Sequence, residues 1–376
     1  KTDKQHILDN PDTYIGSVEC VDQEMFICEN NKLEYKNINY VPGLYKLFDE
    51  GIVNCRDHVI RLQKAMHEKK DDIMPVTHIS VSISDDGVIT MINDGNGIDV
   101  AKHPEYDIWI PELIFGHLRT STNYNKNEEK IVGGKNGFGF KLVLIWSSYG
   151  SIETIDHVRK LKYKQEFKNN LDEIKKPSIT KSSVKPYTKI VFRPDYERFY
   201  GKQNLTDDMR KLFHKRVYDI GAVTPRHIKV KLDGNVVSVK SLQNYMDCFD
   251  LKESPKLIEQ PNDRWEYGVC LTPHGEFTQV SFVNGIYTSK GGKHVDYILN
   301  QITKKLIAYI DKKKKMSVSA NVIKEQLMVF INCTIVNPSF DSQTKDYMNT
   351  PVPKFGSSCV VSDKFIDKIA KMGVME

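Results

Sequence analysis

The sequence lacks the patterns that mark disulfide frameworks, zinc sites and membrane spans. Its seven cysteines are scattered and odd in number, and no two of them form a C-x-x-C pair. The histidines show no spacing typical of metal ligands. A disulfide framework or a zinc site is therefore not expected, and the cysteine usage favours a reducing, intracellular compartment. Because no apolar run approaches membrane-spanning length and the N-terminus lacks a signal-peptide core, we expect no membrane partner.

What the sequence does contain is typical of a soluble globular protein. Of its 376 residues 40% are hydrophobic and 27% are charged, and this length is sufficient for two or three domains. The net charge of +5 permits contact with nucleic acid but does not argue for it. The chain begins at Lys1 rather than Met, so we expect it to be a fragment of a longer protein.

Helix and strand patterns alternate along the first part of the chain, without an internal repeat. Apolar residues at helical spacing predict a helix over 42–66, and alternating residues around an Asp-Asp-Gly turn predict a hairpin over 79–92. The stretch 169–186 is rich in Lys, Ser and Pro, which indicates a surface excursion, and a strand is expected to resume at 189–192.

A domain boundary is expected at 235–245, within a strand–turn–strand pattern over 230–241 that a polar stretch follows. Beyond it we predict strands at 267–271, 278–283 and 327–335, and an amphipathic helix over 295–310 that the lysines 312–315 end. The alternation favours two α/β domains, each with a sheet covered by helices.

Residues 133–141 read Gly-Gly-Lys-Asn-Gly-Phe-Gly-Phe-Lys and form the most informative segment. Four glycines in seven residues leave backbone N–H groups uncovered, and Lys135 and Lys141 add positive charge. Bare amides followed by a helix N-terminus favour anions, so the segment can wrap a polyphosphate. A mobile surface turn is the alternative for such a segment alone.

A polar constellation precedes this segment. Glu50 and Asn54 are four residues apart in the first predicted helix and so share a face, with Asp57 and His58 one turn later. By itself this is also the pattern of a polar stripe on a half-buried helix. The turn at 93–97 (Asn-Asp-Gly-Asn-Gly) and the polar loop at 121–123 (Ser-Thr-Asn) favour a site, because helix face, turn, loop and glycine-rich segment follow in that order.

The order resembles the nucleotide site of the GHKL ATPases, and more closely that of the eukaryotic type IIA DNA topoisomerases, over nearly the whole chain. The motifs that carry the resemblance are 10–17 (Asn-Pro-Asp-Thr-Tyr-Ile-Gly-Ser), 40–54, 113–116 (Leu-Ile-Phe-Gly), 121–124, 282–285 (Phe-Val-Asn-Gly), 288–297 and 337–345 (Asn-Pro-Ser-Phe-Asp-Ser-Gln-Thr-Lys). The resemblance implies an α+β fold of two α/β-sandwich domains. A GHKL (Bergerat) ATPase domain with an N-terminal strap would occupy 1–238, and a transducer domain with a βαβ ribosomal-protein-like fold would occupy 239–376.

The resemblance also implies roles for individual residues. Glu50 would be the general base, Asn54 would coordinate Mg²⁺, and Gln343 and Lys345 would reach the γ-phosphate from the second domain. Asn93 would bind adenine, with Gly95 and Gly97 giving the base room, and Tyr14 would lie on a strap that embraces the other subunit's nucleotide. The remaining expected contacts to ATP are Asp57, His58, Ser121, Thr122, Asn123, Lys130, Gly134, Lys135, Asn136, Gly137, Phe138, Gly139, Phe140, Lys141 and Thr344.

Two residues depart from the family pattern near the phosphates. His58 stands where an Asn is common, and Phe140 replaces a usually small residue, so that its ring would reshape the lid or pack beneath it. Asn10 also replaces the usual Arg before Pro11.

The implied function is that of an ATP-driven gate. Two copies would bind Mg·ATP and close around a duplex DNA segment, and the missing part of the full protein would cut the DNA. Such a protein would work with DNA in the nucleus, or in the nucleus or cytoplasm of a virus-infected cell. The alternatives are a nucleotide-gated DNA clamp with negligible turnover and another GHKL ATPase of the mismatch-repair type. Lys312, Lys313, Lys314 and Lys315 would contact DNA, or else form a solvated helix cap.

Overall fold

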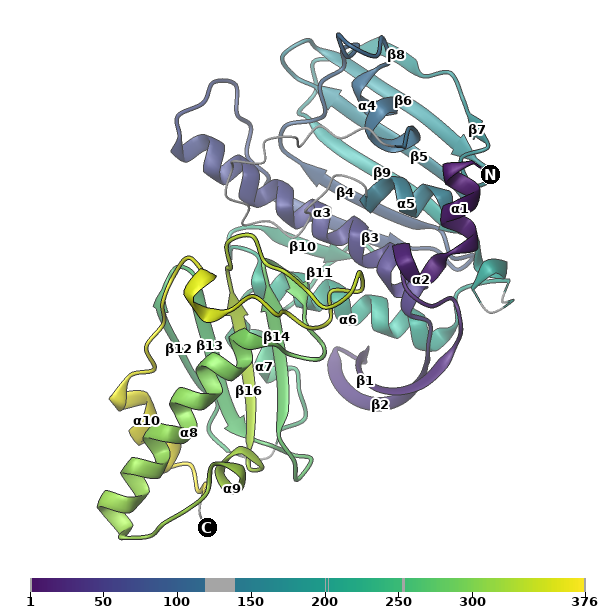
Figure 1. Ribbon diagram of the computed structural model, residues 1–376. Coiled ribbons are helices and arrows are strands. Elements are labelled where there is room, and N and C mark those ends of the chain that lie inside the picture. The colour runs from purple at the N-terminus through teal and green to yellow at the C-terminus, as the bar shows by residue number, and fades with distance from the viewer. Residues whose placement is uncertain (1, 119–138, 200, 202, 252–253, 375–376) are drawn as a thin grey trace.

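A computed structural model describes residues 2–118, 139–199, 201, 203–251 and 254–374. It contains a nine-stranded sheet, a five-stranded sheet and a two-stranded hairpin (Figure 1). The two large sheets lie in separate layers, and helices pack against each of them (Figure 1).

The nine-stranded sheet is built from the first two thirds of the chain. Its strand order is β11-β10-β3-β4-β9-β5-β6-β7, with β8 paired to β6 beside this path. The hairpin predicted over 79–92 is confirmed, because β3 and β4 pair antiparallel from Ile79 with Asn93 to Ile83 with Ile89. The strands are β3 (His78–Ile83), β4 (Ile89–Asp94), β5 (Ser147–Asp156), β6 (Leu161–Lys168), β7 (Glu173–Ile174), β8 (Ser178–Lys181), β9 (Tyr187–Pro194), β10 (Lys229–Leu232) and β11 (Asn235–Val236).

Helix α3 (Pro42–His67) confirms the helix predicted over 42–66. Pro42 opens it, at the position where a proline's missing N–H costs no hydrogen bond. Its apolar face buries Leu47, Phe48 and Ile52 against the sheet and α6 (Asp207–Val223), which leaves the polar face for other contacts. Two short helices, α4 (Ile110–Gly116) and α5 (Gly139–Ile145), pack against each other, and α5 also packs against α3.

The N-terminal arm precedes α3 and packs against the same chain. Helices α1 (Asp3–Asp9) and α2 (Pro11–Tyr14) lead into the hairpin β1 (Val21–Glu29) and β2 (Lys32–Tyr40). Strand β1 packs on α6, and Ile7 of α1 is buried in the main core (Figure 1).

The five-stranded sheet has the order β12-β13-β16-β14-β15. Strands β14 and β16 pair in parallel, and the long helix α8 lies between them in the sequence. This arrangement is the expected βαβ unit. Helices α8 and α10 cover one face, and α7 covers the other. The elements are α7 (Leu242–Asp247), β12 (Leu257–Asn262), β13 (Trp265–Leu271), β14 (Thr278–Val283), β15 (Ile286–Tyr287), α8 (Lys293–Lys314), α9 (Ala320–Lys324), β16 (Leu327–Cys333) and α10 (Asp363–Ala370).

The two faces of the five-stranded sheet belong to different cores. Ile302 and Leu306 of α8 form one buried cluster with Val329 and Ile331. On the opposite face Phe330 belongs to the same cluster as the core of the nine-stranded sheet. The two sheets are therefore joined by apolar packing and not only by the connecting chain.

The predicted surface excursion at 169–186 is exposed over most of its length, and it also contains two short strands that were not predicted, β7 and β8, both paired with β6. The polar stretch at 254–262 contains another strand that was not predicted, β12, which pairs with β13. The second strand predicted within 230–241 is only the two-residue β11, and Ser241 instead caps α7 by accepting from the Asn244 N–H. Edge strands pair through the backbone, so they need few apolar side chains and leave little pattern to detect.

Candidate functional site

The polar face of α3 carries the predicted catalytic pair. Glu50, Asn54 and His58 are spaced four residues apart and are all only partly buried, whereas the adjacent Ile52 and Val53 are buried. The prediction that Glu50 and Asn54 share a face is therefore confirmed. This spacing also brings Lys46, one turn before Glu50, onto the same face.

Glu50 forms an ion pair with a lysine that the sequence analysis did not select. Lys46 Nζ lies 3.0 Å from Glu50 Oε1, and both side chains are largely buried. Burial raises the pKa of Glu50, but the charges of Lys46 and Lys345 outweigh burial, so the pKa of this carboxyl lies below its usual value. Glu50 is thus ionised at neutral pH and can accept a proton.

The end of the glycine-rich segment lies against this carboxylate. A methyl group on Gly139, the first residue of α5, would lie 1.9 Å from Glu50 Oε2. Glu50 therefore points toward Gly139, within the described end of the glycine-rich segment. The other predicted residues of this region, which are Ser121, Thr122, Asn123, Lys130, Gly134, Lys135, Asn136, Gly137 and Phe138, lie outside the described residues.

Phe140 and Lys141 are core residues rather than surface residues of a lid. The Phe140 ring packs edge-on against Phe115 and Phe192, at centroid distances of 5.2 and 5.9 Å. The ring is thus enclosed by other apolar residues of the protein core. Lys141 is buried, and burial lowers the pKa of its ammonium group to about 8. The ring of Phe140 therefore has a packing role, and the expected contact of Phe140 with ATP stays a prediction.

Asn54 has the properties of a ligand for a hard cation. Its amide makes no hydrogen bond with any residue that the structure describes, so its carbonyl oxygen is available. No cluster of three or more His, Cys, Asp or Glu side chains suited to a metal occurs among the described residues. A single amide oxygen fits Mg²⁺, which usually keeps several waters and takes further oxygens from substrate phosphates.

The last two residues of β4, which begin the turn at 93–97, carry polar side chains with different environments. Asn93 is buried and donates from Nδ2 to the Asp94 carbonyl oxygen, 2.9 Å away. Asp94 accepts hydrogen bonds from the Thr77 and His78 N–H groups and pairs with Lys185 at 2.6 Å. Burial raises the pKa of Asp94, but the hydrogen bonds from Lys185, Thr77 and His78 outweigh burial and lower the pKa to about 2. Asp94 is thus a fixed anion beside the predicted adenine residue.

The glycines of this turn lie close to neighbouring parts of the protein. Gly95 has φ +86°, which side chains rarely adopt, and a methyl group there would lie 2.8 Å from Leu62 and from Val76. A methyl group on Gly97 would lie 1.9 Å from the Ile155 carbonyl oxygen. A side chain at either position would therefore collide with the protein itself, and the expectation that these glycines give the base room stays a prediction.

His58 fastens this turn to α3. Its Nε2 lies 2.6 Å from the Asn96 carbonyl oxygen and must donate to it, so Nδ1 accepts from Arg61 Nη2 at 3.3 Å. Burial and the nearby Arg61 lower the pKa of His58 to about 4, so the ring is neutral at physiological pH. Both ring nitrogens therefore have protein partners. His58, which stands where the family commonly has Asn, is used here to hold the turn against α3.

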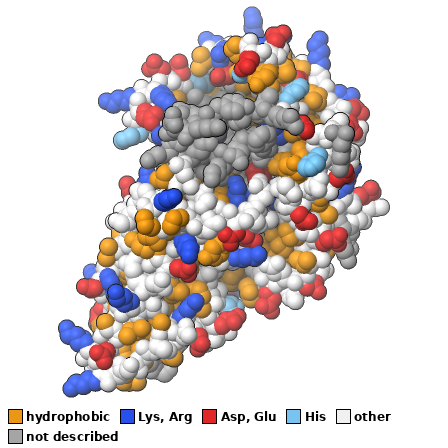
Figure 2. All heavy atoms as spheres, viewed as in Figure 1, with side chains coloured by type: hydrophobic (Ala, Val, Ile, Leu, Met, Phe, Trp, Pro, Cys, Tyr) orange, Lys and Arg blue, Asp and Glu red, His pale blue; other side chains and the backbone are white. Residues whose placement is uncertain are grey.

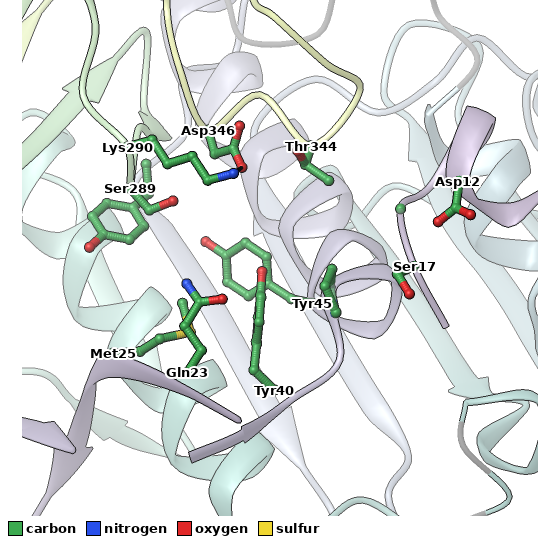
Figure 3. Close-up of a pocket in the computed structure, with 13 residues that line it drawn as sticks. Asp12, Ser17, Gln23, Met25, Tyr40, Tyr45, Ser289, Lys290, Thr344 and Asp346 are labelled. Carbon is green, nitrogen blue, oxygen red and sulfur yellow. Dashed lines mark ion pairs between the residues drawn. The ribbon is translucent and has the colours of Figure 1, made fainter. Parts of the chain in front are cut away.

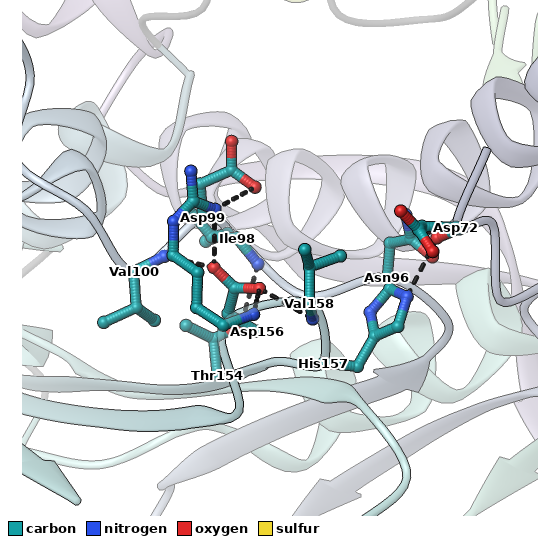
Figure 4. Close-up of polar contacts among 10 residues, drawn as sticks. Asp72, Asn96, Ile98, Asp99, Val100, Thr154, Asp156, His157 and Val158 are labelled. Atoms are coloured by element: carbon teal, nitrogen blue, oxygen red, sulfur yellow. Dashed lines mark hydrogen bonds and ion pairs between the residues drawn. The ribbon is translucent and has the colours of Figure 1, made fainter. Parts of the chain in front are cut away.

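Asn96 continues the same network on its other side (Figure 4). Its Oδ1 accepts from the Met74 N–H at 2.7 Å, and its Nδ2 donates to the Asp72 carbonyl oxygen, which His157 Nε2 also approaches at 2.8 Å. Beyond the turn, Asp156 accepts from the Val100 N–H. Hydrogen bonds therefore hold the turn between α3 and β5.

Lys345 approaches the base from the second sheet. Its ammonium group lies within electrostatic range of Glu50, Asp49, Asp57 and Lys46, and burial together with Lys46 lowers its pKa. Lys345 also has φ +56°, a conformation uncommon for residues other than glycine and typical of functional loops. The structure thus brings Lys345 close to Glu50, and Asp57 lies within electrostatic range of Lys345.

The other residues of this loop, and Tyr14, have different surroundings. Gln343 is exposed, and Thr344 accepts or donates a hydrogen bond with Ser342. A methyl group on Gly16, in the N-terminal arm, would lie 3.0 Å from Thr344 Cγ2, so the arm touches the loop. The Tyr14 hydroxyl lies 2.9 Å from His6 Nδ1 in its own arm.

Sequence reasoning missed a buried charge cluster behind the base. Arg216 of α6 pairs with Asp49 at 2.6 Å, and Lys215 pairs with Asp219 at 2.9 Å, all with little exposure. A detectable signal existed, because these charges stand at helical spacing within an otherwise apolar stretch of α6.

Lys312, Lys313, Lys314 and Lys315 end α8 as predicted. All four are exposed, and none forms an ion pair with a described residue. Figure 2 shows blue side chains at the lower left, over this end of α8. Among the described helices, none is long and apolar enough to cross a bilayer.

Comparisons with known proteins agree with this geometry. A family model described as DNA gyrase B matches residues 233–375. The chain is 42% identical over its whole length to DNA topoisomerase 2 of Arabidopsis thaliana and 41% identical, over 99% of its length, to that of Acanthamoeba polyphaga mimivirus. It spans 25% and 29% of these two relatives.

Solved structures resemble the chain across both sheets. The ATPase region of Saccharomyces cerevisiae topoisomerase II has TM-score 0.90 and 40% identity, covering 100% of this chain and 96% of that one. The ATPase and transducer domains of topoisomerase II from Balamuthia mandrillaris have TM-score 0.89 and 36% identity, covering 99% and 93%. The expected α+β fold is confirmed. The chain belongs to the DNA topoisomerase II family, whose ATPase region it matches.

Proposed function

We propose that this chain binds ATP and hydrolyses it to ADP and phosphate as the entry gate of a type II DNA topoisomerase. The observation that carries the proposal is the position of Glu50, which is ionised between Lys46, Lys345 and Gly139. A buried carboxylate held beside two cations and a glycine-rich segment suits attack of water on a phosphoryl group.

In this reaction Glu50 takes a proton from the attacking water. The water oxygen bonds to the γ-phosphorus, the bond to the β–γ bridging oxygen breaks, and ADP leaves with the electron pair. Lys345 stabilises charge on the γ-phosphate and is lost as a contact once phosphate departs, so the position of its loop depends on the nucleotide state.

Asn54 would hold Mg²⁺ through its amide oxygen. The bound ion supplies charge neutralisation at the phosphates. Asn93 would bind the adenine, and the hydrogen bonds from His58 and Asn96 would keep the turn that carries Asn93 in place.

We further propose an ATPase domain over 1–238 and a transducer domain over 239–376, a division that the separate sheets and the match at 233–375 support. Two copies would close on ATP binding around duplex DNA, which the exposed lysines 312–315 would contact through phosphates. The work would take place wherever the DNA lies, in the nucleus or in a virus-infected cell, since the relatives are eukaryotic and viral.

The alternative of a clamp without turnover loses its motivation. It depended on His58 and Phe140, and these side chains are engaged with Asn96 and with the core. A mismatch-repair type is also disfavoured, because the resemblance to topoisomerase II extends over both sheets.

The proposal is tested by phosphate release from Glu50→Gln, which keeps the shape of the side chain but removes the base. We expect steady-state turnover to fall about 10²–10⁴-fold, with binding of a non-hydrolysable ATP analogue retained. Glu173→Gln is the matched control, since Glu173 pairs with Lys175 on the surface at 3.1 Å. Turnover at the wild-type rate in Glu50→Gln would remove Glu50 as the base. Absence of turnover in the wild-type chain, with and without DNA, would favour the clamp.

A further inference from the structure

Two Asx–Gly turns have the same backbone conformation but different surroundings. Asp233 and Gly234 join β10 to β11 with φ 48° and 86°, and Asn284 and Gly285 join β14 to β15 with φ 52° and 82°. No heavy atom would lie within 4 Å of a methyl group on Gly234. A methyl group on Gly285 would lie 2.5 Å from Arg56 Cδ. The second turn is therefore inserted into the interface with α3.

Arg216 binds this second turn and the catalytic helix at once. Its Nη2 donates to the Gly285 carbonyl oxygen at 2.7 Å, and its Nε donates to Asp49 Oδ1 at 2.6 Å. Asp49 directly precedes Glu50, and Arg216 is fully buried. A planar guanidinium with two bonds in fixed directions sets the position of the turn relative to α3.

The same turn is fastened to the segment that leads into the Lys345 loop. Asn284 Nδ2 donates to the Ile335 carbonyl oxygen, and the Ile335 N–H donates to Asn284 Oδ1, both at 2.9 Å. Farther along, the Lys290 N–H donates to the Asp346 carbonyl oxygen at 2.8 Å. The turn and the Lys345 loop are thus tied to each other through backbone and amide hydrogen bonds.

The interface is tight at this turn and hollow nearby. A cavity of about 300 Å³ lies between the N-terminal arm, the start of α3 and the loops at 289–290 and 344–346 (Figure 3). Tyr45 and Tyr287 line it, and the buried Tyr45 hydroxyl has no hydrogen-bond partner among the described residues. Buried Arg56 Nη1 also has no acceptor within the described part of the chain. The fixed turn therefore borders a hollow and two buried donors that the described residues leave without an acceptor.

We propose that the Asn284–Gly285 turn is the pivot between the two sheets and that Arg216 is a positioning residue for Glu50. The inference rests on the proposed ATPase function, whose Lys345 contact would move the loop about this pivot. Because Arg216 binds both the turn and Asp49, rotation at the turn would move Asp49, the residue next to Glu50.

The test compares Gly285→Ala with its matched control, Gly234→Ala. Both place an alanine at positive φ, but only the first displaces Arg56, so a difference between them reports the interface and not the turn. Thermal unfolding establishes that each variant is folded. We expect Gly285→Ala to lower turnover about tenfold, with analogue binding within about twofold of wild type, and Gly234→Ala to leave both unchanged.

A second readout does not depend on hydrolysis. Spin labels at the exposed positions Val158 and Val322, one on each side of the interface, report their separation with and without a non-hydrolysable ATP analogue. We expect the analogue to change the separation in wild type and in Gly234→Ala but not in Gly285→Ala. An unchanged separation in wild type, or the same change in Gly285→Ala, would overturn the pivot. If the separation changes but wild type does not hydrolyse ATP, the proposed function fails and the pivot stands.

Lys345→Met distinguishes coupling from general destabilisation. If the pivot acts through the Lys345 contact, adding Gly285→Ala to Lys345→Met costs no more than about twofold in turnover. Full multiplication of the two losses would contradict the coupling. Should Gly285→Ala fail to fold, Arg216→Lys retains the charge but not both directed bonds, and its loss of turnover must likewise shrink in the Lys345→Met background; an undiminished loss would overturn the role of Arg216.

Discussion

Gly97 ends the turn at 93–97, Gly139 begins α5, and both glycines have equally close neighbours. A methyl group on either would lie 1.9 Å from an oxygen atom. At Gly97 that oxygen is the backbone carbonyl of Ile155 in β5, and at Gly139 it is the terminal oxygen of the Glu50 side chain. Backbone in a sheet cannot move without disturbing its pairing, whereas a side chain can rotate.

The difference shows how the two sides of the site are built. The side of the turn at 93–97 is held by hydrogen bonds of His58 and Asn96 and by the ion pair of Asp94 with Lys185, all within the part of the chain that forms the nine-stranded sheet. The side of Glu50 is held by charges, and one of them, Lys345, comes from the loop after the second sheet. We infer that the first side is part of the fold and that the second can respond to the nucleotide.

Gly97→Ala is expected to have the largest effect, because it forces a backbone shift. Overpacking of this kind costs about 1–3 kcal/mol, and the turn that carries Asn93 moves with it. We expect a lower unfolding temperature and loss of measurable analogue binding. Calorimetric unfolding and equilibrium binding test this, and unchanged values for both would show that the turn is not rigid.

Gly139→Ala breaks the comparison in the opposite sense. The atom in the way is the end of a side chain that can rotate, so the unfolding temperature should stay close to that of wild type. The displaced Glu50 carboxylate should nevertheless lower turnover about 10²-fold, the usual cost of moving a catalytic group by about 1 Å. Phosphate release measured beside unfolding temperature tests both halves. A parallel fall of the two would mean that Gly139, like Gly97, supports the fold.

Sequence patterns predicted the parts of this molecule that depend on local spacing. Helix α3, the hairpin of β3 and β4, and the shared face of Glu50 and Asn54 follow from periodicity within a few turns. The pairing of Lys46 with Glu50 was equally local, but periodicity does not reveal that a charged pair is buried.

Contacts between distant segments could not be read from the same patterns. The obstacle at Gly97 is a carbonyl group in another strand, and Arg216 meets Gly285 across 69 residues of sequence. The exposed edge strands β7 and β8 also left no apolar pattern, because their partners are backbone groups of β6. The missing information is therefore tertiary in each case.

Lys46→Met removes one of the two charges beside Glu50 and is expected to have the smallest effect on the rate at neutral pH. Burial raises the pKa of Glu50, and the charges of Lys46 and Lys345 together hold it below its usual value. Without Lys46 the pKa of Glu50 rises. When the pH is lowered, the base therefore becomes protonated at a higher pH than in wild type. The acidic limb of the pH profile of kcat/KM for ATP should therefore move to higher pH.

Lys371→Met is the control for this change, since Lys371 also pairs with a carboxylate one helical turn away, Asp367 at 2.9 Å, but is exposed. Its pH profile should match that of wild type. Because Lys345 remains near Glu50 in Lys46→Met, adding Lys345→Met should move the acidic limb further in the same direction. A limb that stays in place in both variants would mean that Glu50 does not set it, and the charged side of the site would have to be assigned to another base.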